Sequence, residues 1–174
     1  MPNFDSLNNL IDFDYSQMRA LKYDNRSMAT NDVIFNFVKN LNDFFDQFNN
    51  QQPDKETLNQ FEKIINQVIS KASNTEYLYY KDKYSKEYGS EYGVEMAESA
   101  KINDISALRS RMQYWAASET WGDAIRNPEM HIKATDSLNI WDKYLKNRNN
   151  LNDTPPVLFN KKLDFNSYLK ELNK

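Results

Sequence analysis

The chain has 174 residues, of which 40% are hydrophobic, 27% charged and 14% aromatic, and its formal net charge is −3. A chain of this length ordinarily forms one compact domain. The absence of Cys excludes disulfides, thiolate metal sites and a cysteine nucleophile. A single His and only 3 Gly argue against a histidine metal site, a catalytic triad and a glycine-rich phosphate loop. We therefore expect a protein that is not an enzyme and that has no cofactor, no metal and no small-molecule substrate.

Charge is divided unevenly along the chain. Residues 1–100 carry 10 Lys and Arg against 16 Asp and Glu, whereas residues 101–174 carry 12 against 9. An acidic first part and a mildly basic second part suit attraction within one molecule, head-to-tail attraction between copies, or an anionic partner for the second part. Ordinary scatter in composition explains so small an excess equally well.

The sequence leads us to expect neither a membrane span nor a signal peptide. No apolar run approaches the roughly 18 residues that a membrane-spanning helix needs. The first five residues lack the basic and apolar stretches of a secretory signal. We expect a cytoplasmic protein that does not bind membranes.

Two amphipathic helices joined by a short polar segment are the clearest predicted elements. Apolar side chains recur at steps of three and four over residues 31–50, and the same spacing returns over residues 54–72. Pro53 ends the polar segment, and Asp54 can cap the second helix. The two helices should form a central antiparallel hairpin. The side chains expected in its core are Phe37, Leu41, Phe61 and Ile65.

Tyrosines are concentrated in residues 75–92, where they are interleaved with three Lys. Several of them follow at four-residue steps and should share one face of a helix. This mixture can stack on single-stranded nucleic acid, but packing of rings with solvated hydroxyls, or a protein interface, explains it better. Gly89 and Gly93 bracket a predicted turn, and Ser90 can begin a short helix.

Two further helices are predicted over residues 105–121 and 128–147. Asp104 can cap the first, and Asn127 followed by Pro128 is a strong start signal for the second. Both helices carry an apolar stripe at three- and four-residue steps. They form a mildly basic helical pair.

These elements predict an all-α fold of about six helices in one compact domain. Residues 1–100 form an acidic helical part with the hairpin and the tyrosine-rich segment. Residues 101–150 contain the helical pair. Residues 151–174 should form an extended strap followed by a short helix from Asp164.

Candidate catalytic chemistry is found around His131 and at the paired acids Asp12 and Asp14, which a solvated acidic segment explains better than a glycosidase site. A metal site would need Glu129, Asp123 or Glu119 as further ligands, and a hydrolytic site would need Ser118 with Glu119. The sequence has neither the ligand spacing of a metal motif nor the glycines of a nucleophile turn. No catalytic or metal-binding residues are therefore expected.

One stretch of the chain resembles a known family. Its parts are the helix Ile105-Ser106-Ala107-Leu108-Arg109-Ser110-Arg111-Met112, a spacer from Trp121 to Arg126, the run Pro128-Glu129-Met130-His131-Ile132-Lys133-Ala134, and then Leu138 and Tyr144-Leu145. This arrangement resembles a segment of the small subunits of tailed-bacteriophage terminases. In that family the segment follows the DNA-binding part and contributes to helical packing and ring assembly. The resemblance implies a non-enzymatic protein that recognises DNA and assembles as an oligomer for genome packaging in the host cytoplasm.

Duplex DNA would have to be bound by the second part of the chain, because the acidic first part repels phosphate. Weak contacts of this kind become useful when an oligomer multiplies them. The basic side chains expected to contact nucleic acid are Arg109, Arg111, Arg126, Lys133, Lys143, Lys146 and Arg148.

The alternative function is that of an acidic protein-binding inhibitor or accessory factor, for example a DNA-mimicking anti-defence or host-takeover protein. Its acidic first part could imitate a row of phosphates toward a basic partner. In either case we expect a homo-oligomer or a larger protein partner, because the aromatic content exceeds what one small helical core needs. The residues expected at the interface are Tyr80, Tyr84, Tyr88, Trp115, Trp121 and Trp141.

Overall fold

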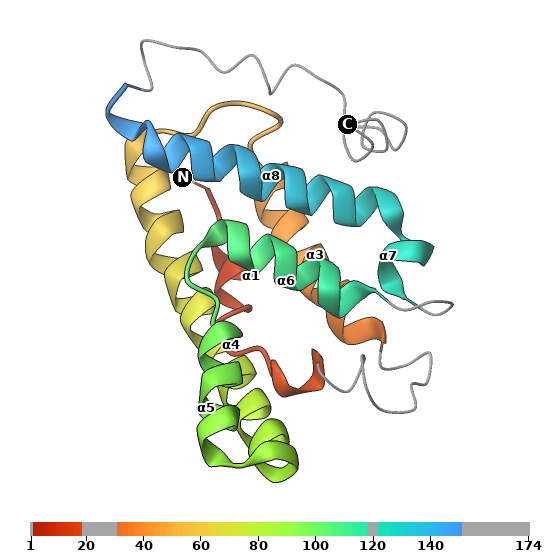
Figure 1. Ribbon diagram of the computed structural model, residues 1–174. Coiled ribbons are helices and arrows are strands. Elements are labelled where there is room, and N and C mark those ends of the chain that lie inside the picture. Colours follow the sequence, from red (N-terminus) through yellow and green to blue (C-terminus); the bar gives the residue numbers. More distant parts are fainter. Residues whose placement is uncertain (1, 19–30, 118–121, 151–174) are drawn as a thin grey trace, which may run out of the picture.

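The computed structural model describes residues 2–18, 31–117 and 122–150. Regular structure in these ranges is helical, and no strand occurs in them, which confirms the all-α prediction. The strap and final helix predicted for residues 151–174 lie outside the described residues. The helices, shown in Figure 1, are α1 (Asp5–Asn8), α3 (Asn31–Asp46), α4 (Lys55–Tyr88), α5 (Ser90–Ser99), α6 (Ile105–Ala116), α7 (Asp123–Arg126), α8 (Pro128–Lys146) and the 3-10 turn η2 (Arg148–Asn150).

Helix α4 is the longest element, with 34 residues, and it continues well past the end predicted at residue 72. At its start the Asp54 carboxylate accepts a hydrogen bond from the backbone N–H of Thr57 at 2.8 Å, as the sequence indicates. Hydrogen bonds from the Thr57 side chain and backbone hold the pKa of Asp54 below its ordinary value. No Gly or Pro interrupts the helix before Gly89, whose φ of 97° suits a residue without a Cβ.

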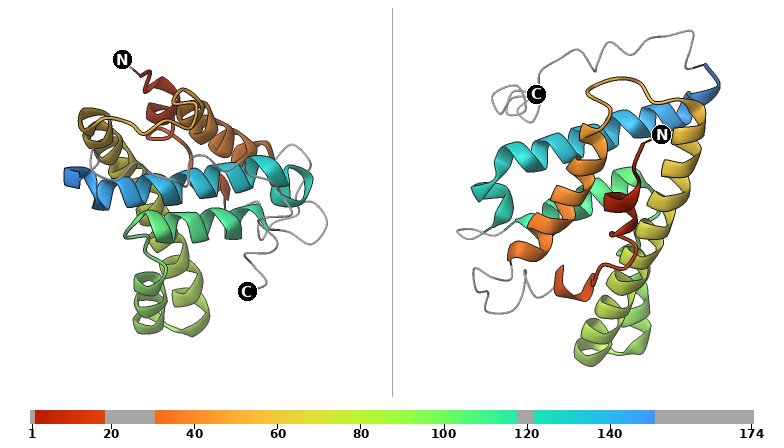
Figure 2. Two further views of the ribbon diagram at one scale, coloured as in Figure 1. Left: turned by 90° about the horizontal axis from the view of Figure 1, so that it is seen from above. Right: turned by 180° about the vertical axis from the view of Figure 1, so that it is seen from behind.

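Helices α3 and α4 form an open pair and do not pack along their whole length. Near the loop that joins them, the rings of Phe44 and Phe61 stack with centroids 5.8 Å apart. Farther from the loop the two helices diverge, and α1 lies between them and contacts both (Figure 2). Helix α3 ends at Asp46, ahead of residue 50, because Asn49 and Asn50 adopt left-handed backbone conformations. The two helices of the predicted hairpin are therefore held apart over part of their length, and α1 packs between them.

The main core is centred on Trp141 of α8. Its ring lies against four phenylalanine rings, two from α3, one from the turn just after α3 and one from α4, at centroid distances of 4.8 to 5.3 Å. We call Phe44, Phe45, Phe48, Phe61 and Trp141 the aromatic cluster. The four core side chains predicted from the hairpin pattern are all fully buried: Phe37, Leu41, Phe61 and Ile65.

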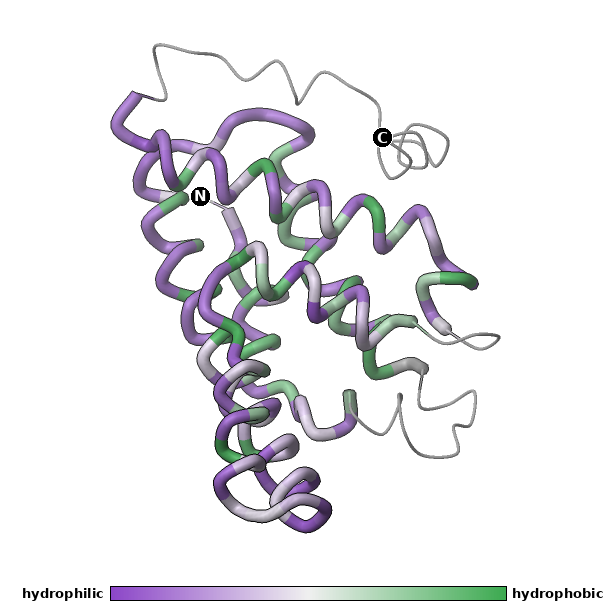
Figure 3. Tube along the Cα trace, viewed as in Figure 1, coloured by the Kyte–Doolittle hydropathy of each residue, from purple (hydrophilic) through white to green (hydrophobic). Residues whose placement is uncertain are grey.

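Helices α4 and α5 form a two-helix projection that extends away from the rest of the molecule (Figures 1 and 2). We call residues 77–100 the tip. Gly93 lies inside α5, and not at a turn as predicted, and a Cβ there would come within 2.7 Å of the backbone N of Ser85 and 2.9 Å of the backbone O of Lys81. The glycine thus allows the two helices to approach closely. Figure 3 shows that the far end of the tip carries mostly hydrophilic and neutral residues.

Candidate functional site

Four tyrosines form a continuous row along the tip. Tyr80, Tyr84 and Tyr88 follow at four-residue steps on α4, and their neighbouring rings stack at centroid distances of 5.7 and 6.2 Å. Tyr92 comes from α5 and meets the rings of Tyr84 and Tyr88 at 6.0 and 5.0 Å. The predicted common face is confirmed for the three α4 residues. We call Tyr80, Tyr84, Tyr88 and Tyr92 the tyrosine ladder.

The tyrosine ladder runs from a buried base to an exposed end. Tyr80 is only 9% exposed and packs with Ala97 and Ala100 in a small cluster that is separate from the main core. Tyr84 is half-buried, whereas Tyr88 and Tyr92 are 64% and 41% exposed. Exposed tyrosine rings offer a large apolar area with a polar hydroxyl, which is why tyrosine is enriched at protein interfaces.

Charged side chains are sorted between the two helices of the tip. Helix α5 carries Glu91, Glu95 and Glu98 and no cation, whereas the last turns of α4 carry three Lys against Asp82 and Glu87. The tip as a whole holds three basic and five acidic residues, so its charge opposes the approach of phosphate. Stacking on nucleic acid is therefore the weaker interpretation of the tyrosine ladder.

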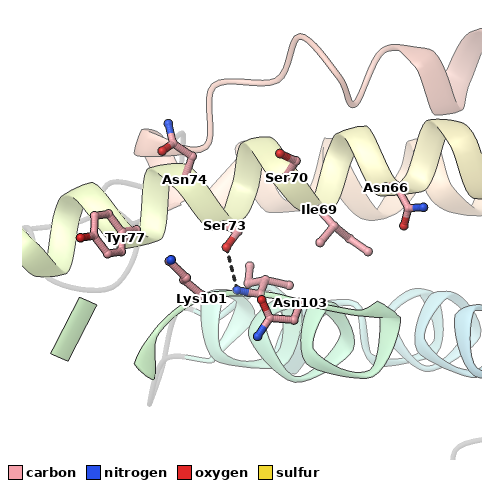
Figure 4. Close-up of a pocket in the computed structure, with 9 residues that line it drawn as sticks. Asn66, Ile69, Ser70, Ser73, Asn74, Tyr77, Lys101 and Asn103 are labelled. Atoms are coloured by element: carbon pink, nitrogen blue, oxygen red, sulfur yellow. Dashed lines mark hydrogen bonds between the residues drawn. The ribbon is translucent and has the colours of Figure 1, made fainter. Parts of the chain in front are cut away.

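A polar groove of about 670 Å³ lies at the base of the tip, between α4 and the loop that leads into α6 (Figure 4). Ser73 Oγ accepts a hydrogen bond from the backbone N–H of Ile102 at 2.8 Å, which holds this loop against α4. Lys101 lies 5.0 Å from the centre of the Tyr77 ring and 2.9 Å from Glu98. These contacts hold the loop before α6 against α4 at the base of the tip, which gives the groove residues a structural role. Its lining residues are Asn66, Ile69, Ser70, Ser73, Asn74, Tyr77, Lys101, Ile102 and Asn103.

A buried carboxylate at the other side of the tip base ties three helices together. Glu76 of α4 is 1% exposed, and its Oε1 accepts a hydrogen bond from the indole N–H of Trp115 in α6 at 2.7 Å. Arg111 lies 3.8 Å from the same carboxylate and donates to the carbonyl oxygen of Ala100, just after α5. The sequence analysis did not identify Glu76, because an isolated acid in a long helix normally faces solvent.

His131 pairs with Asp123, one of the ligands considered for a metal site. The Nε2 of His131 donates to Asp123 Oδ2 at 2.5 Å, and Asn127 Nδ2 donates to Oδ1 of the same carboxylate at 2.9 Å. Asn127 therefore does not cap α8 with its side chain, although Pro128 occupies the first turn as predicted. Both members of the His131–Asp123 pair are buried. The pair joins α7 to α8, and in the described part of the chain no three metal-ligating side chains come together.

Two of the predicted DNA contacts are half-buried and hydrogen-bonded to other elements of the fold. The Nε of Arg109 donates to the carbonyl oxygen of Thr135 at 2.8 Å and so fastens α6 to α8. Arg111 lies 3.8 Å from the carboxylate of the buried Glu76. Removing either side chain would disturb packing as well as surface charge.

Four more of these basic residues lie beside carboxylates, and Lys143 is exposed. A neighbouring carboxylate lowers the local positive potential that would attract a phosphate. Six of the seven predicted contacts are thus engaged within the described structure. The four pairs are Arg126 with Asp123, Lys133 with Asp46, Lys146 with Asp142, and Arg148 with Glu62.

Two of the three predicted interface tryptophans do not lie on the surface. Trp115 and Trp141 are each 1% exposed, so the prediction that they form subunit contacts is wrong. Both supply rings to the core instead, as large aromatic side chains usually do. Trp121 lies outside the described residues. Of the predicted interface set, Tyr84 and Tyr88 remain accessible, and Tyr92 joins them.

The place of Tyr92 in the ladder was only partly visible in the sequence. The four-residue step continues from Tyr88 to Tyr92, but Gly89 ends α4 between them. The close approach of α4 and α5 at Gly93 restores the row across the turn. That approach depends on tertiary packing, which helical periodicity alone does not reveal.

Comparisons of this chain with protein-family models, with curated proteins and with solved structures find no match. The resemblance of residues 105–148 to terminase small subunits therefore stays a prediction. None of the described helices is both long and apolar enough to cross a lipid bilayer.

Proposed function

We propose that this chain is a non-enzymatic helical binding protein that associates with another protein through the α4–α5 tip. The observation that carries this proposal is the exposed end of the tyrosine ladder, on a projection that stands clear of the main core. Exposed aromatic side chains on a projecting element are accessible to a partner with little rearrangement of the fold.

Neither the main core nor the small cluster of the tip includes the outer two tyrosines. The tip has its own small cluster around Tyr80, Ala97 and Ala100, and Tyr88 and Tyr92 lie beyond that cluster. A polar residue at either position would leave the main core unchanged. Their apolar area therefore supports a role in binding.

Assembly through the tip is compatible with both functions that the sequence suggests. A phage assembly protein related to terminase small subunits would use α6 and α8 as the helical packing elements that the resemblance implies. A protein-binding inhibitor or accessory factor would use the tip to contact its target. The pairing of Arg109, Arg111 and their neighbours inside the fold favours protein contact over DNA contact as the primary activity.

Site-specific photo-crosslinking tests the proposed function. The full chain carrying Tyr88→p-benzoylphenylalanine is irradiated in cells that express it, and the matched control carries the same residue at Lys143, which is exposed on α8. We expect a slower-migrating protein adduct from position 88 and at least fivefold less from position 143. Mass spectrometry identifies the protein in the adduct.

Equal labelling from the two positions, or labelling from position 143 alone, would contradict the proposal. An adduct from position 143 that disappears on nuclease treatment would instead favour DNA handling by the second part of the chain.

A further inference from the structure

We propose that Tyr88 and Tyr92 form a site of oxidative coupling, at which a haem peroxidase with hydrogen peroxide joins the two rings into one dityrosine within the chain. The new bond bridges the turn between α4 and α5. This inference goes beyond the proposed function and does not depend on it, because the reaction needs no partner bound to the tip.

The two rings are the tyrosines that an oxidant at the protein surface reaches first. Among the described residues, the tyrosine side chains that are exposed are those of Tyr88 and Tyr92, at the end of the tip that projects from the rest of the molecule (Figure 1). Tyr84 is half-buried, and the oxidisable indoles of Trp115 and Trp141 are buried. One-electron oxidation at the described surface is therefore directed to this pair.

The same two rings are direct neighbours. Their centroids lie 5.0 Å apart, which is the shortest separation in the tyrosine ladder, and their planes meet at 64°. Rings at this distance and angle are in edge-to-face contact. Because exposed side chains change rotamer within nanoseconds, the edges of the two rings meet repeatedly.

The turn between the rings holds them together and leaves them room to rotate. Tyr88 is the last residue of α4, and Tyr92 is the third residue of α5. A Cβ built at Gly89, between them, would meet no atom within 4 Å apart from its chain neighbours. On the other side of the turn, Gly93 packs against the backbone of α4 and fixes the two helices side by side.

The coupling balances in atoms and electrons. Each phenol gives one electron to the oxidised haem of the peroxidase and its hydroxyl proton to water, which leaves a phenoxyl radical. The two radicals form a bond between ring carbons adjacent to the hydroxyl-bearing carbons, and the hydrogens of the bonded carbons move to the oxygens, which restores both phenols. The two electrons and two protons that are released reduce one hydrogen peroxide to two waters.

Coupling within the chain is favoured over the other fates of the radicals. The chain has no Cys, so none of its own thiols reduces them. Two radicals held in contact react in a unimolecular step, and their effective concentration is far above that of a second chain in dilute solution. The product is therefore a bridge inside one chain.

Peroxidase treatment of the purified full chain in dilute solution tests this inference. Trypsin cleaves after Lys86 and Lys101, and it releases residues 87–101 as one peptide that contains both rings. After treatment with peroxidase and hydrogen peroxide, we expect this peptide to lose the mass of two hydrogens and to gain the blue fluorescence of dityrosine. A protease that cleaves after Glu91 should then give two fragments that remain joined.

Matched variants assign the bond to its two rings. Tyr88→Phe and Tyr92→Phe each keep the ring and lack the phenol hydroxyl, so each change should lower the yield of the coupled peptide at least tenfold. Tyr84→Phe alters the neighbour of both rings and should leave the yield within about twofold of the wild type, because Tyr84 is not one of the bonded residues. Circular dichroism of all three variants should match the wild type.

The inference is overturned if the 87–101 peptide of the treated wild type keeps its mass, or if Tyr92→Phe gives the coupled peptide as readily as the wild type. A yield that rises with chain concentration would show coupling between chains and would also overturn it. A coupled peptide from a chain that gives no photo-adduct at position 88 would support this inference and contradict the proposed function.

Discussion

Replacement of Trp141 by Ala should lower the free energy of unfolding by about 3–5 kcal/mol, which is the usual cost of removing a buried Trp or Phe ring. The loss has two parts. The indole is 1% exposed, so its apolar area returns to water as a cavity opens. Its removal also abolishes ring contacts with Phe44, Phe45, Phe48 and Phe61, each at 5.3 Å or less.

Urea unfolding followed by circular dichroism measures this effect. Trp141→Phe retains an aromatic ring and should cost clearly less than Trp141→Ala. The surface control Tyr88→Ala should remain within about 0.5 kcal/mol of the wild type. A loss below about 1 kcal/mol for Trp141→Ala would show that the aromatic cluster is not the main core.

Replacement of Asp123 by Ala should lower the free energy of unfolding by about 3 kcal/mol, because it leaves the donors of the buried His131 and of the half-buried Asn127 without this acceptor. The carboxylate accepts from His131 Nε2 and from Asn127 Nδ2, and it is 1% exposed. The cost comes from the orphaned donors rather than from lost apolar area.

Asp123→Asn separates the two contributions. The amide oxygen of Asn can still accept one of these hydrogen bonds, so this variant should be more stable than Asp123→Ala. Arg126→Ala is the matched control, because Arg126 is exposed and lies 3.9 Å from the same carboxylate. If the free energy of unfolding fell no further for Asp123→Ala than for Arg126→Ala, the His131–Asp123 pair would not be a structural link.

The main helices followed from the sequence because their apolar spacing is regular. Asp54 and Asp104 cap the helices they were expected to cap, with hydrogen bonds of 2.8 Å to the backbone N–H of Thr57 and Ala107. The relative placement of α3 and α4 could not be predicted from the sequence. Two amphipathic helices joined by a short loop predict a closed hairpin, and nothing in their own pattern shows that α1 will lie between them.

The sequence analysis assigned several side chains to the surface that contact other elements of the fold. Helical periodicity does not show which side chains such tertiary contacts will engage. Basic residues on a helix face look available for phosphate in the sequence, yet Arg109 and Arg111 reach backbone carbonyls and a buried carboxylate on other elements. Trp115 and Trp141 were similarly assigned to an interface because aromatic content was high. The three ladder tyrosines of α4 were easier to predict, because their spacing is a property of one helix.

The most direct measurement of whether the tip is an association surface is the sedimentation rate of the wild-type chain and of Tyr88→Ser/Tyr92→Ser in extracts of the cells that express them. These substitutions remove the exposed rings while leaving the main core intact. We predict that the wild type sediments faster than a single chain, because a partner is bound to it, and that the variant sediments as a single chain with unchanged circular dichroism. A variant that sediments as fast as the wild type would place the contact elsewhere and contradict this role for the tip.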